Sequence, residues 1–300
     1  MLIGREGYPL GWVRAYQSRS ELLVGPGSLP RYLSEDTRPL CRTLSFAGRF
    51  RGAIDVNGIR TSRHRWTAIL AGTFGALFGV LAINPVSRST WLLENILVFA
   101  FVAVLALTYR SFPFSRISYT LIFLFLCLHE VGSHYTYSEV PYDEWFERFT
   151  GATLNARMGW ERNHFDRAIH LAYGLLLTYP IREIFLRVAR VRGFWGYFLP
   201  LDVAMSTSLT YELIEWGAAV VFGGDLGQSY LGTQGDVWDA HKDMALAALG
   251  ALIAMTVTLV INLLLQRDFA AEWAESLRVK GKDPLGEERI AEMLAEREAD

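Results

Sequence analysis

The chain has 300 residues, of which 51% are hydrophobic and 20% are charged, and its formal net charge is -2. This composition excludes an intrinsically disordered or collagen-like chain, and two cysteines are too few for a disulfide-stapled scaffold. A net charge this close to zero also predicts no nucleic-acid partner. The apolar residues concentrate in long stretches, so we expect the lipid bilayer to be the main partner of the protein.

The N-terminal region carries charge throughout and contains many glycines and prolines, and we expect a small cytoplasmic N-terminal cap over residues 1–65. Within it, residues 50–61 alternate between apolar and polar side chains around the pair Asn57-Gly58. Because Asn-Gly favours a tight type I′ turn, this stretch predicts a β-hairpin.

Six stretches of low charge follow, each long enough as a helix to cross a hydrocarbon layer of roughly 30 Å. They predict an all-α, polytopic helical membrane protein with a six-helix transmembrane domain over residues 66–266. Six crossings place both termini on one side, and the segments of that side hold 23 of the 29 lysines and arginines. Because positive residues concentrate in cytoplasmic segments, the N and C termini are predicted to be cytoplasmic. The expected spans are 67–84, 91–109, 117–134, 165–181, 197–222 and 243–266.

Two helices are expected outside the spans. Residues 141–149, in the longest outer connection, are apolar on one side and acidic on the other, as in a short interfacial helix. Residues 267–300 predict a cytoplasmic amphipathic helical tail with Ile290, Met293 and Leu294 on one face. A solvated helix or weak self-association is the expected role of this tail.

The last four spans carry close pairs of acidic or histidine side chains, whereas the first two spans have almost none. Three or four residues separate the members of each pair, so both members lie on one face of their helix. An ionisable side chain inside hydrocarbon costs roughly 2.5–3.5 kcal/mol, which makes each pair a candidate for function. The pairs are Glu130 with His134, Asp166 with His170, Glu212 with Glu215, and Asp239 with Asp243.

The depth of these pairs suggests that they meet. A helical rise of about 1.5 Å per residue places all four pairs in the outer half of the bilayer. Carboxylates gathered in a low dielectric must be protonated or neutralised by a cation, and carboxylates with imidazoles suit a divalent metal such as Zn, Mn or Fe. The predicted metal ligands are His134, Asp166, His170, Glu212, Asp239 and Asp243.

The remaining charged groups allow a hydrolytic reaction, with a metal-bound water as the nucleophile. Glu130 or Glu215 would then act as the acid or base, and Arg162 or Arg167 would hold an anionic headgroup. The expected substrate is a cell-envelope lipid or a lipid-linked molecule. Two other functions stay open: a proton- or cation-coupled transporter that uses the same carboxylates, and a non-catalytic structural or regulatory subunit.

Four motifs resemble the YjdF-like bacterial inner-membrane family, and the resemblance covers about residues 67–266. It implies a multi-pass protein of the plasma (inner) membrane and does not specify an activity. The motifs begin at His129-Glu130, Asn163-His164, Tyr211-Glu212 and Gly232-Thr233.

A more distant resemblance links the chain to the VanZ-like membrane proteins, which are associated with glycopeptide antibiotic resistance and cell-envelope phenotypes. It rests on the order of three motifs, Asp166-Arg-x-x-His170, Glu212-x-x-Glu215 and Asp236-x-x-Asp239-x-x-x-Asp243. VanZ-like proteins usually have Lys, Gln and Asn where this chain has Arg167, Glu215 and Asp243. The predicted site is therefore more acidic than that of the VanZ-like proteins.

Overall fold

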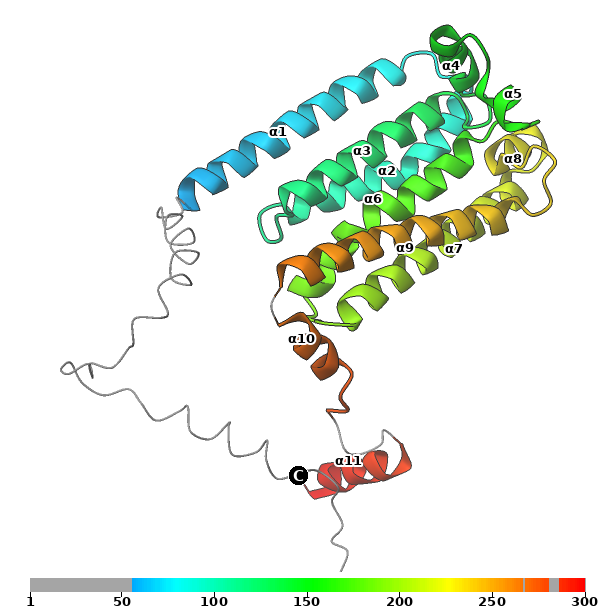
Figure 1. Cartoon of the computed structure of the whole chain (residues 1–300). Coiled ribbons are helices and arrows are strands. Elements are labelled where there is room, and N and C mark those ends of the chain that lie inside the picture. The colour runs from blue at the N-terminus through cyan, green and yellow to red at the C-terminus, as the bar shows by residue number, and fades with distance from the viewer. Residues whose placement is uncertain (1–55, 267, 281–285, 300) are drawn as a thin grey trace, which may run out of the picture. The chain divides into compact units, whose positions relative to one another are not determined.

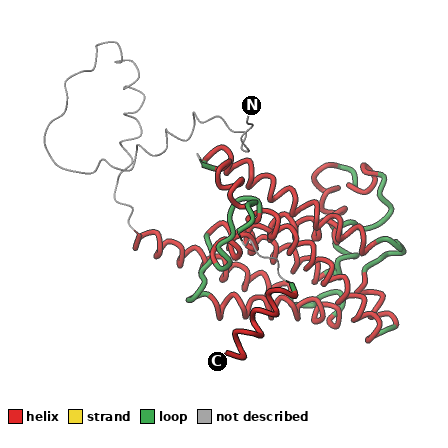
Figure 2. The backbone as a smooth tube through the Cα atoms, turned by 90° about the horizontal axis from the view of Figure 1, so that it is seen from below, coloured by secondary structure: helices red, strands yellow, loops and turns green. Residues whose placement is uncertain are grey.

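The computed structural model describes residues 56–266, 268–280 and 286–299. Every regular element in these ranges is a helix, and the tube in Figure 2 shows only helix and loop along them. The six longest helices coincide with the predicted spans, which confirms the all-helical expectation. They are α1 (Val56–Leu81), α2 (Arg88–Thr108), α3 (Arg116–His134), α6 (Phe165–Arg187), α7 (Trp195–Phe222) and α9 (Asp239–Leu265).

The predicted β-hairpin is wrong over the part that the structure describes. Asn57 and Gly58 lie in the first turn of α1, while residues 50–55 of the prediction fall outside the described residues. An isolated two-stranded hairpin is marginally stable, whereas a helix gains one hydrogen bond for each residue added to it. The apolar helix therefore extends toward the N-terminus, past the expected boundary at residue 66.

By length and composition alone, three helices in the described ranges could cross a membrane: α2, α3 and α9. The chain is thus a polytopic helical membrane protein. Helices α1, α6 and α7 are of similar length, with 26, 23 and 28 residues. Because α1, α6 and α7 are not among the helices that meet this criterion, their crossings stay predictions.

Polar and apolar side chains are distributed as expected for a protein dissolved in lipid. The outside of the long helices presents large apolar side chains such as Leu107, Val221 and Leu264, which are 83%, 77% and 79% exposed. The interior contains fully buried polar side chains, among them Glu130 and Asn95, both 0% exposed. Hydrocarbon solvates apolar groups but not polar ones, so polar groups gather between the helices.

The short helices lie at the two ends of the long ones. At one end Figure 1 shows α4 (Tyr142–Thr150), α5 (Leu154–Met158) and α8 (Gly224–Leu231), and α4 coincides with the predicted interfacial helix. At the opposite end, α10 (Phe269–Ser276) packs Phe269 and Trp273 against Tyr197 of α7. The predicted C-terminal helix forms as α11 (Glu287–Ala299), and Ile290, Met293 and Leu294 are exposed on it.

Helices α6 and α9 approach each other closely because glycine and alanine line their contact. A Cβ atom on Gly174 of α6 would overlap the backbone carbonyl of Ala247, and a Cβ on Gly250 of α9 would overlap that of Leu171. Ala247 and Ala251 are 0% exposed between them. Small residues commonly allow such close backbone packing between membrane helices. This contact fixes how the N-terminal turns of α6 and α9 face each other.

Candidate functional site

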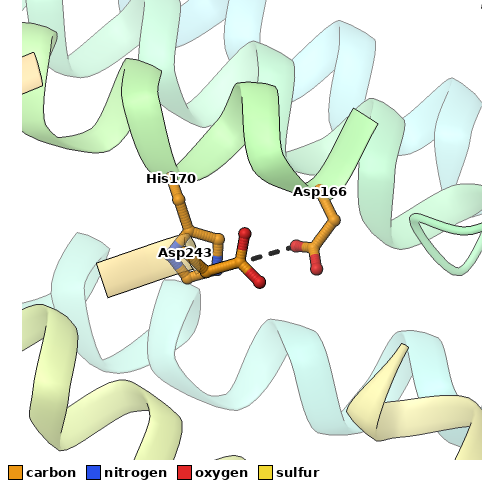
Figure 3. A group of neighbouring side chains, drawn as sticks. All are labelled: Asp166, His170 and Asp243. Atoms are coloured by element: carbon orange, nitrogen blue, oxygen red, sulfur yellow. Dashed lines mark ion pairs between the residues drawn. The ribbon is translucent and has the colours of Figure 1, made fainter. Parts of the chain in front are cut away.

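The first turns of α6 and α9 bring Asp166, His170 and Asp243 together. One ligand atom from each of the three side chains lies within 4.8 Å of the other two. Figure 3 shows Asp166 and His170 projecting from α6 toward Asp243. The site is deeply buried, since His170 is 7% exposed and Asp243 is 2% exposed.

Glu212 of α7 joins this group from a third helix. Its Oε1 lies 3.5 Å from Nε2 of His170, and Oδ1 of Asp166 lies 3.7 Å from the same nitrogen. Both separations exceed the usual N–H···O distance of about 2.7–3.2 Å. Oε1 of Glu212 and Oδ1 of Asp243 are buried and have no hydrogen-bond partner among the described residues. A buried carboxylate oxygen without a partner is energetically unfavourable, so a cation bound here would stabilise both oxygens.

We call Asp166, His170, Glu212 and Asp243 the outer cluster, after the position predicted for them from the sequence. One imidazole and three carboxylates from three helices match the nitrogen and oxygen donors that Zn, Mn and Fe accept. The carboxylates also carry enough charge to neutralise a divalent ion. Four of the six predicted metal ligands therefore meet.

Asp239, another predicted ligand, is held by arginines instead. Nη1 of Arg162 donates to its Oδ1 at 2.5 Å, and Nη2 of Arg167 donates to the same oxygen at 3.3 Å. Arg162 also donates to the backbone carbonyls of Gly232 and Thr233. The two predicted anion contacts are thus already engaged with the chain's own acceptors.

Asp236 completes this charged network next to the outer cluster. Arg167 donates to its Oδ2, and Nζ of Lys242 lies 2.6 Å from the same oxygen. The hydrogen bonds from Lys242, from the backbone N–H of Trp238 and from Arg167 hold the pKa of Asp236 well below its ordinary value. Asp236 therefore stays ionised and forms ion pairs with the side chains of Arg167 and Lys242.

His134, the sixth predicted ligand, does not join the outer cluster. It ends α3, and its Nδ1 lies 2.7 Å from the backbone carbonyl of Leu81, the last residue of α1. The backbone carbonyl of His134 accepts a hydrogen bond from the N–H of Val86. The imidazole thus ties the end of α3 to the end of α1.

The two predicted acid/base residues lie in different surroundings. Glu130 is 0% exposed, and both its carboxylate oxygens lack a hydrogen-bond partner in the described ranges. Glu215 is half-buried, near Tyr211 and Glu94. The Tyr211 hydroxyl donates to Oε2 of Glu94 at 3.0 Å, which links α7 to α2.

Sequence reasoning missed two tyrosines of the site, Tyr211 and Tyr137. Tyr137 follows α3 and folds back over Gly132, where a Cβ atom would collide with its ring. Its hydroxyl oxygen lies 2.5 Å from Nδ1 of His129. Burial, together with the charges of Glu94 and Asp166, raises the pKa of Tyr137 well above its ordinary value, so the phenol stays protonated. The motifs that contain these tyrosines were visible, but Glu94, the partner of Tyr211, is 117 residues away, and Tyr137 reaches His129 only because the chain folds back after α3.

A cavity of about 130 Å³ opens beside the outer cluster, between α3, α6 and α7. It has room for several water molecules. Polar walls include Asp166, His170, His129, Tyr137 and Ser208, and aromatic rings complete the lining. Water or a small polar group can thus reach the carboxylates from inside the helix bundle.

Comparison with known proteins gives one family and one relative. The family described as "Predicted membrane protein (DUF2238)" matches residues 66–263. The Inner membrane protein YjdF of Escherichia coli (strain K12) is 40% identical over 171 residues, which cover 57% of this chain and 78% of that protein. No solved structure matches the chain. The match confirms the YjdF-like resemblance, while the VanZ-like resemblance continues to rest on motif order.

Proposed function

The chain belongs to the DUF2238 family of predicted membrane proteins, and on that premise we propose that it is a multi-pass inner-membrane protein whose outer cluster binds a divalent metal ion. The metal would serve to hydrolyse a cell-envelope lipid or a lipid-linked molecule. Asp166, His170 and Asp243 are the ligands of this proposal, with Glu212 as the fourth.

One observation supports a metal ion in the outer cluster. Asp243 is 2% exposed, and its unpartnered Oδ1 belongs to a group whose ligand atoms lie within 4.8 Å of one another. Carboxylates this close repel each other unless protons or a cation neutralise them. Imidazole beside them favours Zn, Mn or Fe over Ca or Mg, which prefer oxygen ligands alone.

The hydrolytic role follows from what such an ion does to water. A bound divalent ion lowers the pKa of a coordinated water, so hydroxide becomes available at neutral pH. Hydroxide formed from this water, whose proton would pass to a nearby carboxylate, would attack an ester or phosphoester centre. The resulting carboxylic acid would protonate the leaving group as its bond to that centre breaks. Glu215 and Glu130 remain the candidates for that acid, because both are carboxyl groups on helices that line the same cavity.

A lipid-linked substrate is favoured because the cluster lies within the membrane-spanning helices and beside a partly aromatic cavity. Arg162 and Arg167 stand at its edge. Either arginine would have to exchange an aspartate oxygen for a substrate anion.

Metal content tests the proposal directly. We expect the protein purified in detergent to contain one Zn, Mn or Fe ion per chain by inductively coupled plasma mass spectrometry. Asp243→Asn and Asp166→Asn should lower that content to background, since each removes a charged ligand. Asp202→Asn is the matched control, because Asp202 is an exposed acid of α7 outside the outer cluster.

His134→Ala tests whether His134 is a metal ligand, as the sequence predicts, or lies outside the metal site, as in the structure. It should keep the full metal content, since the imidazole binds the carbonyl of Leu81 instead of the outer cluster. Absence of stoichiometric metal in the parent protein would refute the metal proposal. For the hydrolytic step, an envelope lipid extract incubated with metal-loaded protein should lose one lipid class, and Asp243→Asn should leave that class intact.

A proton- or cation-coupled transporter is the second candidate, and a specific feature favours it. Glu94, Glu130 and Glu215 are carboxylates outside the outer cluster. The hydroxyl of Tyr211 on α7 donates a hydrogen bond to Glu94 on α2. Buried carboxylates of this kind can carry protons. A metal-free parent with proton-driven uptake in proteoliposomes, lost in Glu212→Gln, would favour this candidate. A purely structural subunit predicts that the same substitutions change stability alone.

We also propose that both termini are cytoplasmic, on the strength of the lysine and arginine distribution. Reporter fusions test it: alkaline phosphatase fused to either terminus should be inactive, and green fluorescent protein fused there should fluoresce. Alkaline phosphatase inserted after Gly151, between α4 and α5, should be active. The opposite pattern would move the outer cluster to the cytoplasmic side.

A further inference from the structure

A second cavity, of about 570 Å³, lies between α1, α2 and α3, away from the outer cluster. Its size falls within the roughly 300–1,000 Å³ of small-molecule sites. Its walls are almost entirely apolar and include Phe74, Leu105, Ile122 and Leu126, together with the small residues Ala71 and Ala106. We call it the α1 groove.

The α1 groove has one polar end. His64 and Tyr109 line it there, and Nδ1 of His64 lies 2.7 Å from the Tyr109 hydroxyl. The Tyr119 hydroxyl and Nε of Arg63 are buried, and neither has a hydrogen-bond partner within the described part of the chain. Tyr119 itself is 7% exposed and lines the groove. Unsatisfied buried donors of this kind point to an acceptor that belongs to a ligand.

Arginines dominate the charge at this end in the described part of the chain. The nearby acid, Glu183, accepts hydrogen bonds from Ser115 and Ser118 beside Tyr119 and is paired with Arg187. Helix α1 contains no acidic residue, and Arg63 and Arg65 lie in its first turns. Arg110 and Arg116 lie around the connection from α2 to α3. Basic residues at the level of the headgroups attract anionic lipids.

The length of the α1 groove matches one leaflet. From His64 to Phe74 the helix advances ten residues, or about 15 Å at 1.5 Å per residue. Half of a hydrocarbon core of roughly 30 Å is the same distance. An acyl chain that starts at His64 would therefore reach the middle of the bilayer at Phe74.

We propose that the α1 groove holds one acyl chain of an anionic phospholipid, whose phosphate accepts hydrogen bonds from Arg63 and Tyr119. The apolar walls replace the neighbouring lipid tails, and the bound chain fills the space between α1 and the α2–α3 pair. This lipid holds α1, which packs mainly on α3, against the remaining helices.

Lipid analysis of the full chain tests this site. The protein purified in a mild detergent should retain about one phospholipid per chain, enriched in phosphatidylglycerol over the membrane extract, by native mass spectrometry and lipid chromatography. Ala106→Phe fills the groove and should lower retention at least fivefold. The matched control is Leu107→Phe, whose position is 83% exposed on the outer face of the same helix.

Arg63→Gln tests the headgroup contact separately. It should still retain a phospholipid but lose the preference for phosphatidylglycerol. Ala71→Leu repeats the filling test from α1 in case Ala106→Phe does not fold, as judged by circular dichroism. Two results would overturn the proposal: a parent that retains no phospholipid, as expected if residues 1–55 fill the groove, or equal retention in the filling variants and Leu107→Phe.

Discussion

Alanine at Gly174 or Gly250 is expected to lower the free energy of unfolding by about 1–3 kcal/mol, the usual cost of overpacking. The added Cβ would overlap a backbone carbonyl of the opposite helix, that of Ala247 or that of Leu171. A backbone atom cannot rotate away as a side chain can, so α6 and α9 must separate. This loss outweighs the gain of about 1 kcal/mol that alanine gives over glycine in a helix.

Gly217→Ala in α7 is the control, because nothing lies within 4 Å of a Cβ atom at that position. It should leave stability unchanged or raise it slightly. Unfolding in mixed detergent, followed by circular dichroism, measures all three variants. A Gly174→Ala protein as stable as Gly217→Ala would mean that α6 and α9 do not pack as closely as the structure shows.

The same variants report on the outer cluster. Asp166 and His170 lie two turns and one turn before Gly174, and Asp243 lies two turns before Gly250, so separation of the helices also separates the ligands. Metal content should therefore fall in Gly174→Ala even though no ligand is changed. This links the close helix contact to the proposed site by an observable other than stability.

The helices were predictable because the formation of a membrane helix depends on a short, continuous stretch of sequence. A helix in hydrocarbon must be long and apolar, so a window of sequence is enough to find it. The pairs of Asp166 with His170 and Asp239 with Asp243 were visible for the same reason, since helical spacing alone places each pair on one face. The β-hairpin around Asn57 failed because a local turn preference competes with extension of the neighbouring helix.

The assignment of partners was not predictable, because it depends on which helices touch. Asp239 and Asp243 look alike in sequence, yet Asp239 faces two arginines and Asp243 faces His170. His134 has the helical spacing of a ligand, but the end of α1 lies beside it. Contacts between residues 53 or more positions apart decide these cases, and a single sequence contains no record of them. Glu94 is a lone acid in an otherwise apolar span, which indicates that it needs a polar partner. In the structure that partner is Tyr211.

Arg162→Ala is expected to lower the free energy of unfolding by about 3–5 kcal/mol, the cost of leaving a buried charge without its partner. Asp239 is 4% exposed, and Arg162 supplies its shortest hydrogen bond, at 2.5 Å. Arg167 remains at 3.3 Å from the same oxygen but is shared with Asp236. Exposed Arg278, paired with Glu275 at 3.1 Å, gives the control: Arg278→Ala should cost no more than about 1 kcal/mol.

The double variant Arg162→Met with Asp239→Leu separates a structural arginine from one that binds substrate. Removal of both charges leaves no unpaired carboxylate, so most of the lost stability should return. If Arg162 only pairs with Asp239, the double variant should also recover turnover of the lipid class that the parent consumes. If Arg162 contacts a substrate anion, stability should return while turnover stays lost, because methionine offers no donor to that anion. Failure of the double variant to regain stability would mean that the carbonyls of Gly232 and Thr233 depend on Arg162 more than Asp239 does.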